Sequence, residues 1–160
     1  MASARASVLI GLGRPVEAVR CCCDALRADP TDPVLHANLA IAFEAAGHLD
    51  AAMASFGDAL RLDPACFPAL LNRGALLQRL GRHDEACASN EVLVRAHPGV
   101  ADAHFNHAES LLAAGEFESA LAACDRALSL DACHCGALID RAVALAMLAR
   151  FDASAAAFSA

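Results

Sequence analysis

The sequence predicts an all-α protein, an α-solenoid built from antiparallel helix-turn-helix hairpins, and three observations support this fold class. Turn residues recur at a fixed interval of 34 residues, and small residues recur at the same interval between them. The apolar content comes from alanine, leucine and cysteine rather than from rings, since 58% of the 160 residues are hydrophobic and only 4% are aromatic. Small side chains allow helices to pack closely against one another.

Two kinds of turn residue mark the ends of the predicted helices. Glycine takes a left-handed backbone conformation without penalty, so the recurring glycines are expected where the first helix of each hairpin ends. Proline lacks the N–H that would continue a helix, so the recurring prolines are expected just after each second helix. The glycines are Gly13, Gly47, Gly81 and Gly115, and the prolines are Pro30, Pro64 and Pro98.

Residues inside the predicted helices show how each hairpin packs. Small residues on the first helix should face small residues on the second, so that the two helices approach closely, while larger apolar residues fill the layers between hairpins. Acids that open the second helix and arginines that close it suit the helix dipole. The small residues are Ala6, Ala40, Gly74, Ala108 and Ala142, opposite Ala18, Ala52, Ala86, Ala120 and Ser154; the acids are Asp50, Asp84, Glu118 and Asp152, and the arginines are Arg27, Arg61 and Arg95.

This frame divides the single solenoid segment of residues 1–160 into four repeats, 1–32, 33–66, 67–100 and 101–134, and a truncated repeat, 135–160. Ala149 stands in the last repeat where the others have glycine, and a second helix is expected to begin near Asp152. The sequence ends inside that helix, which is typical of a fragment of a longer solenoid. Phe151 and Phe158 are then expected to leave apolar surface exposed, so that the end of the chain frays or self-associates.

A 34-residue helix-turn-helix with these small, apolar and proline positions resembles the tetratricopeptide repeat family, over nearly the whole chain. The resemblance implies a right-handed superhelix that binds another polypeptide along its concave face and carries out no chemistry itself. The sequence departs from the family pattern at His36 and His104, which take the usual tryptophan position, and at Asn90, which takes a normally aromatic core position.

Charge and composition exclude several classes of partner. The formal net charge is −7 and the pI is about 5.4, which opposes nucleic-acid binding because that requires clustered basic residues. No apolar run reaches the roughly 18 residues that a membrane span needs, and no signal-peptide cleavage pattern follows the N-terminus. The eight cysteines follow no regular framework, which favours a reducing, cytoplasmic location.

The candidate peptide-binding residues form a polar column at the same 34-residue interval, namely Asn38, Asn72, Asn106 and, on the fourth rung, Asp140. Each stands two residues before the small packing residue of its first helix, a position expected to face the inner groove, and the three asparagine side chains are expected to be exposed there. A primary amide both donates and accepts hydrogen bonds, as gripping a peptide backbone requires. The alternative is that asparagine is tolerated there as a solvated or capping residue.

Packing distances allow this column to follow an extended peptide. Neighbouring helices lie roughly 8 to 10 Å apart and an extended strand rises about 3.3 Å per residue, so one asparagine meets about every third peptide residue. Binding should then be weak and tolerant of peptide sequence. Asp140 only accepts hydrogen bonds when ionised, which biases its end of the groove toward basic or amide-rich segments.

The asparagine column also resembles the tetratricopeptide region of O-linked N-acetylglucosamine transferases and their bacterial relatives. That resemblance implies an alternative function, the substrate-recognition arm of a larger glycosyltransferase whose catalytic domain is absent from this sequence. The carboxylate clamp of chaperone-binding members is disfavoured, because Ala37, Leu71, Phe105 and Ile139 stand where the clamp needs basic residues.

Signs of catalysis and of metal binding are weak. Gly11-Leu12-Gly13 lacks the strand and the third glycine of a dinucleotide fingerprint, and no nucleophile elbow is present, so we expect no catalytic residues and no cofactor. Cys133, His134 and Cys135, with His97, His104 and His107 nearby, are soft metal ligands without a known zinc spacing. Packing roles are favoured instead, with Cys22 and Cys124 in the core.

Overall fold

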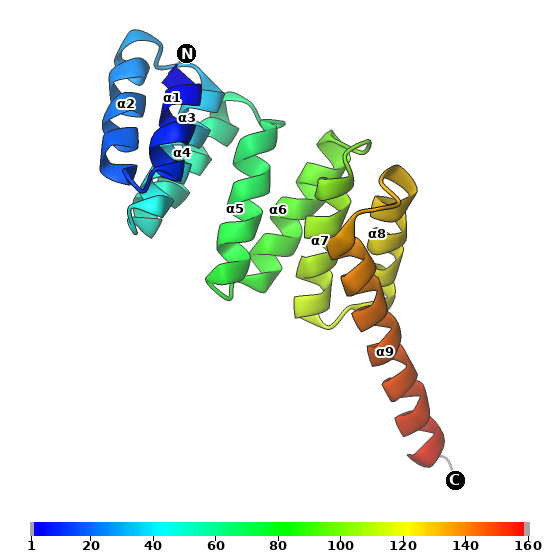
Figure 1. Cartoon of the computed structure of the whole chain (residues 1–160). Helices are drawn as coiled ribbons and strands as arrows, with labels where there is room; N and C mark the ends of the chain where they lie inside the picture. The colour runs from blue at the N-terminus through cyan, green and yellow to red at the C-terminus, as the bar shows by residue number, and fades with distance from the viewer. Residues whose placement is uncertain (1, 159–160) are drawn as a thin grey trace. The chain divides into compact units, whose positions relative to one another are not determined.

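The computed structural model describes residues 2–158, with side chains over residues 3–150. This part of the chain forms helices and no strand (Figure 1). The predicted all-α fold class is thereby confirmed. The helices are α1 (Ala2–Gly11), α2 (Pro15–Ala28), α3 (Pro33–Ala45), α4 (Leu49–Leu62), α5 (Phe67–Arg79), α6 (His83–Ala96), α7 (Ala101–Ala114), α8 (Phe117–Leu130) and α9 (Cys135–Phe158).

The turns within the hairpins form as the glycines predict. Gly13, Gly47, Gly81 and Gly115 all have positive φ, between 70° and 82°, the left-handed region in which a side chain would be strained. Helix ends follow the charge pattern too, with an acid in the first turn of α4, α6 and α8 and an arginine in the last turn of α2, α4 and α6.

The small residues predicted to join the helices of each hairpin lie in the core. Those of the first four hairpins are buried in both helices. Ala142, the fifth, is instead exposed. It lies in α9, the last of the described helices.

The chain divides into two units, residues 1–73 and residues 74–160. In the first unit, α1 packs against α2 and α3, and α3 packs against α4. In the second, α7 packs against α6, α8 and α9, and α8 also packs against α9. First helices of successive hairpins therefore contact each other within a unit, α1 with α3 and α7 with α9, and this contact positions the candidate site.

The last repeat differs from the expected hairpin. α9 is one continuous helix that runs through Ala149 and Asp152, so the turn and the second helix predicted there do not form. Alanine is the best helix former and is strained in the left-handed conformation that glycine adopts in the other turns. The side chains of Phe151 and Phe158, expected to expose apolar surface, lie outside the described residues, and self-association stays a prediction.

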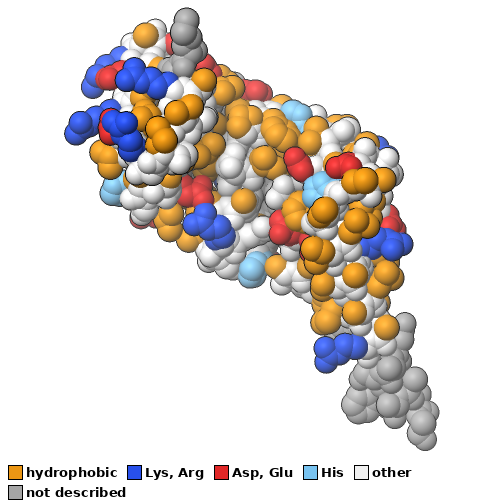
Figure 2. Space-filling view, in the orientation of Figure 1, with side chains coloured by type: hydrophobic (Ala, Val, Ile, Leu, Met, Phe, Trp, Pro, Cys, Tyr) orange, Lys and Arg blue, Asp and Glu red, His pale blue; other side chains and the backbone are white. Residues whose placement is uncertain are grey.

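The described part of α9 exposes apolar side chains, visible toward the lower right of Figure 2. They are Leu138, Ile139, Val143 and Leu145, between 42% and 63% exposed. None of the described helices is both long enough and apolar enough to span a membrane.

Candidate functional site

The four residues of the predicted column lie in first helices, Asn38 in α3, Asn72 in α5, Asn106 in α7 and Asp140 in α9. The sequence predicts exposed side chains for the three asparagines. All three are half-buried instead, as is Asp140. Asn38 and Asn72 belong to the first unit, and Asn106 and Asp140 to the second.

The amide nitrogens of the asparagines make hydrogen bonds within the chain, which accounts for their partial burial. Asn72 donates to the carbonyl oxygen of Pro68 at 2.8 Å, and Asn106 donates to that of Asp102 at 2.7 Å, one helical turn back in each case. Asn38 donates to Ser3 Oγ at 2.9 Å, across the contact between α3 and α1. An amide nitrogen carries two hydrogens, so each side chain keeps one N–H, and its Oδ1, for a ligand.

Two carboxyl groups with raised pKa values lie on the first helices of the second unit. Burial raises the pKa of Asp140, and His134 partly offsets this rise. Burial also raises the pKa of Glu109 in α7, and the charge of Asp140 adds to it. Asp140 Oδ2 is buried and receives no hydrogen bond from the described residues. A donor group brought by a ligand would relieve this desolvation.

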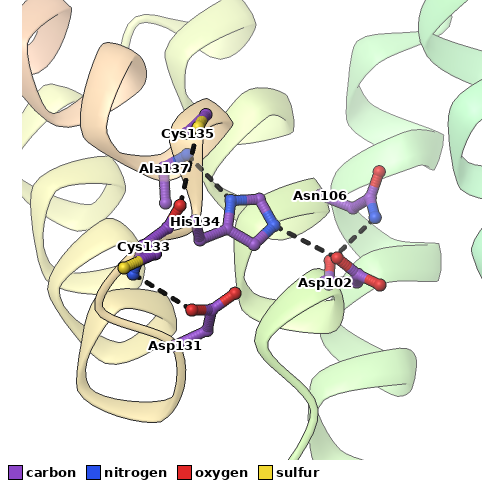
Figure 3. A network of polar contacts seen from close by, with 7 residues as sticks. All are labelled: Asp102, Asn106, Asp131, Cys133, His134, Cys135 and Ala137. Atoms are coloured by element: carbon purple, nitrogen blue, oxygen red, sulfur yellow. Dashed lines mark hydrogen bonds and ion pairs between the residues drawn. The ribbon is translucent and has the colours of Figure 1, made fainter.

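His134 fixes the first helices of this unit relative to each other (Figure 3). Its Nδ1 accepts the backbone N–H of Ala137 at 3.1 Å, which caps the N-terminus of α9. Its Nε2 lies 3.1 Å from Asp102 Oδ1 in α7. Because Nδ1 acts as an acceptor, Nε2 carries the proton that it donates to Asp102. The backbone carbonyl of the same Asp102 accepts a hydrogen bond from the Asn106 amide, so Asp102 contacts both His134 and one residue of the column.

A buried polar network holds the backbone of α7 beneath Asn106. The Asn106 carbonyl accepts Asn90 Nδ2 at 2.9 Å and Ser110 Oγ at 3.0 Å. Gln78 Nε2 lies 3.3 Å from the same carbonyl and 2.9 Å from Ser110 Oγ. Asn90 is fully buried, so this network replaces the aromatic side chain expected at its position.

Two other histidines, His36 and His104, hold turns, and two of the cysteines lie in the core, while Cys133 and Cys135 are exposed. Nε2 of His36 lies 3.0 Å from the Pro30 carbonyl, and that of His104 lies 2.9 Å from the Pro98 carbonyl, so each histidine holds the turn before its helix. Cys22 and Cys124 are fully buried, as predicted for small apolar core residues. Burial raises the pKa of each of these two thiols to about 11. Among the described residues, no three His, Cys, Asp or Glu side chains are placed to hold a metal ion.

Three participants in the site, Ser3, Glu109 and Asp102, were not predicted from the sequence. Asp102, Asn106 and Glu109 follow one face of α7 at helical spacing, a signal that was present in the sequence. Ser3 contacts Asn38 only because α1 and α3 pack together. That contact depends on tertiary structure.

Comparison with known proteins identifies the repeat. The family model described as tetratricopeptide repeat matches residues 37–101 and 91–133, which together cover more than half of the chain. No curated protein matches the sequence.

Solved structures with the same fold are distant in sequence. MamA from Desulfovibrio magneticus RS-1, residues 41 to the end, is 22% identical with a TM-score of 0.73, covering 93% of this chain and 90% of that one. TTC0263 from Thermus thermophilus is 24% identical with a TM-score of 0.74, covering 88% and 77%. YrrB, described as having an unusual peptide-binding site, is 19% identical with a TM-score of 0.71, covering 88% and 73%. At these identities the likeness shows the fold alone.

Proposed function

Because the chain belongs to the tetratricopeptide repeat family, we propose that it is a non-catalytic scaffold that binds extended peptide segments of partner proteins. The observation that carries the proposal is the polar column Asn38, Asn72, Asn106 and Asp140, which recurs on the first helices at one position of the repeat. Repeat proteins build extended binding surfaces from such recurring positions. YrrB, a protein of the same fold, is described as peptide-binding, which supports this class of ligand.

The proposed contacts involve the main chain of the peptide. Each asparagine keeps one N–H and its Oδ1 for the ligand, and an internal hydrogen bond holds its amide in place. A fixed amide loses less side-chain entropy on binding than a free one. At about 1 kcal/mol net per hydrogen bond, the column contributes a few kcal/mol, which gives weak binding that depends little on peptide sequence.

The test compares two sets of alanine substitutions. The site variant is Asn38→Ala, Asn72→Ala and Asn106→Ala. The control is Asp50→Ala, Asp84→Ala and Glu118→Ala, which share the 34-residue spacing and are exposed on second helices. Linear peptides selected from a random library on the unmodified chain are measured by fluorescence anisotropy.

We expect the site variant to bind the selected peptides at least about tenfold more weakly, and the control to change affinity by less than about threefold. Equal losses in both variants, or no loss in the site variant, would contradict the proposal. Circular dichroism verifies that both variants stay folded.

Asp140 gives the second unit a preference for donor-rich peptides. Its desolvated carboxylate, beside Glu109, gains most from an arginine or lysine side chain, because a cation offsets burial of the charge. Asp140→Asn is therefore expected to reduce the affinity ratio of basic over acidic peptides by about tenfold. A ratio that stays unchanged would remove Asp140 from the binding site.

A narrower form of the proposal places the chain as the substrate-recognition arm of an O-linked N-acetylglucosamine transferase-like enzyme. Its support is the asparagine column, which resembles that of those enzymes. Sequencing the gene beyond residue 160 decides the matter, since a glycosyltransferase domain in frame would support this form. A stop codon or an unrelated domain would eliminate it and leave the scaffold proposal unaffected.

A further inference from the structure

A cleft of about 700 Å³ opens between α1 and α2, and its lining includes no residue of the asparagine column. It arises from helical spacing, because Arg5 and Leu9 stand one turn apart on α1 and the stripe from Glu17 to Asp24 faces them from α2. Leu9, Cys21 and Ala25 form its half-buried apolar part. Its volume falls within the range of small-ligand sites, roughly 300 to 1,000 Å³.

The acids that line this cleft are already paired with arginines outside its lining. Arg14 binds both carboxylate oxygens of Glu17 through two nitrogens, each at 2.6 Å, and this hydrogen-bonded pairing lowers the pKa of Glu17. Asp24 pairs with Arg27 through a single hydrogen bond along the helix. These pairs are internal to α2 and its cap, and the charges of Arg20 and Arg5 also lower the pKa of Glu17.

Arginines outnumber acids around the cleft, because Arg5 and Arg20 line it in addition to the two arginines that pair with its acids. Among the described residues, neither Arg5 nor Arg20 has an ion pair or a hydrogen bond. Both are exposed at the rim, while the floor between them is apolar. Figure 2 shows the arginine side chains gathered over the first two helices, at the upper left. This positive surface belongs to a chain whose net charge is −7.

We propose that this cleft is a second binding site, which takes an acidic peptide segment with an apolar side chain between two carboxylates. Guanidinium groups bind carboxylates in a bidentate manner, so Arg5 and Arg20 each take one carboxylate. The apolar side chain enters between them onto Leu9 and Ala25. The site is independent of the asparagine column. It binds carboxylates through guanidinium groups, whereas the column binds a peptide main chain through amides, and it lies between a first and a second helix.

The lining favours a peptide over other anionic ligands. Polyanions such as nucleic acid need many phosphate contacts from clustered cations, and this cleft offers two free arginines beside two acids. The volume holds a few side chains rather than a folded surface, which argues against a second copy of the chain.

The experiment uses a short fluorescein-labelled peptide in which one leucine stands between two glutamates within a glycine and serine spacer. The site variant is Arg5→Gln with Arg20→Gln. The matched control is Arg95→Gln with Arg126→Gln, an equal change of charge at exposed positions on α6 and α8. A third variant, Ala25→Phe, fills the floor without altering charge.

The unmodified chain and the control should bind the peptide with equal affinity, and binding should weaken as salt rises. The site variant and Ala25→Phe should each bind at least about tenfold more weakly, with thermal unfolding confirming that both are folded. No binding by the unmodified chain, or equal loss in the control, would overturn the proposal. So would tighter binding of inorganic polyphosphate at the same arginines, or a mass that doubles with concentration in place of peptide binding.

Discussion

Phe56 in the first unit and Asn90 in the second take the same position of the repeat, and both are fully buried. Phe56 brings only carbon to the core. Asn90 donates to Ser110 Oγ at 2.6 Å and to the Asn106 carbonyl at 2.9 Å, and its Oδ1 is buried without a hydrogen bond from the described residues. One unit uses the position for apolar stability, while the other uses it to hold the backbone beneath a residue of the candidate site.

The largest loss of stability is expected from a change at Phe56, the apolar residue of this pair. Phe56→Ala removes a fully buried ring and leaves a cavity, which should lower the free energy of unfolding by about 3 to 5 kcal/mol. Urea unfolding followed by circular dichroism measures the change, with Asp50→Ala at an exposed position of the same helix, α4, as the control. A loss below about 1 kcal/mol would mean that the aromatic ring is not the main support of its unit.

Gly74 lies against Asn90, so a single methyl group added at Gly74 should lower the stability of the protein. A Cβ at Gly74 would come within 2.2 Å of Asn90 Oδ1, so Gly74→Ala should lower the free energy of unfolding by about 1 to 3 kcal/mol. Asn90→Ala should relieve the clash, so the double variant should be more stable than the sum of the single changes predicts. Strict additivity of the two changes would contradict a direct contact between these residues.

Replacing Asn90 with an apolar residue, as the first unit has at Phe56, should stabilise the protein slightly. In Asn90→Leu, Ser110 Oγ still accepts Gln78 and still donates to the Asn106 carbonyl, so no buried polar group of the network loses all its partners. Removal of the buried, unpaired Oδ1 should raise the free energy of unfolding by about 1 kcal/mol. A marked loss in the same urea experiment would show that the network stabilises the second unit.

Much of this architecture was predictable from the sequence, because the recurring glycines, prolines and small residues act through local backbone geometry and hairpin packing. The failure at Ala149 was also local, since alanine allows the helix α9 to continue. The half-burial of the asparagines was not predictable. It depends on which acceptor each amide finds, such as Ser3 across a tertiary contact, and the 34-residue spacing carries no information about that choice.

The smallest expected effect is a pH dependence confined to the second unit. The folded-state pKa values of Asp140 and Glu109 are raised, so the folded state binds more protons than the unfolded state just above the ordinary carboxyl pKa values. Stability contributed by these groups is present at low pH and is lost as pH rises through their folded pKa values. Asp140→Asn with Glu109→Gln should flatten this slope in unfolding experiments. An unchanged slope would assign the pH dependence to other groups.

Backbone substitution in the ligand tests whether the asparagine column binds the main chain of a peptide. A selected peptide is compared with versions that carry N-methyl groups on successive backbone nitrogens, and with versions whose side chains are exchanged. We predict that N-methylation at about every third residue weakens binding about tenfold or more, while side-chain exchange changes affinity by less than about threefold. Peptides that tolerate N-methylation throughout but lose binding when single side chains change would contradict the account.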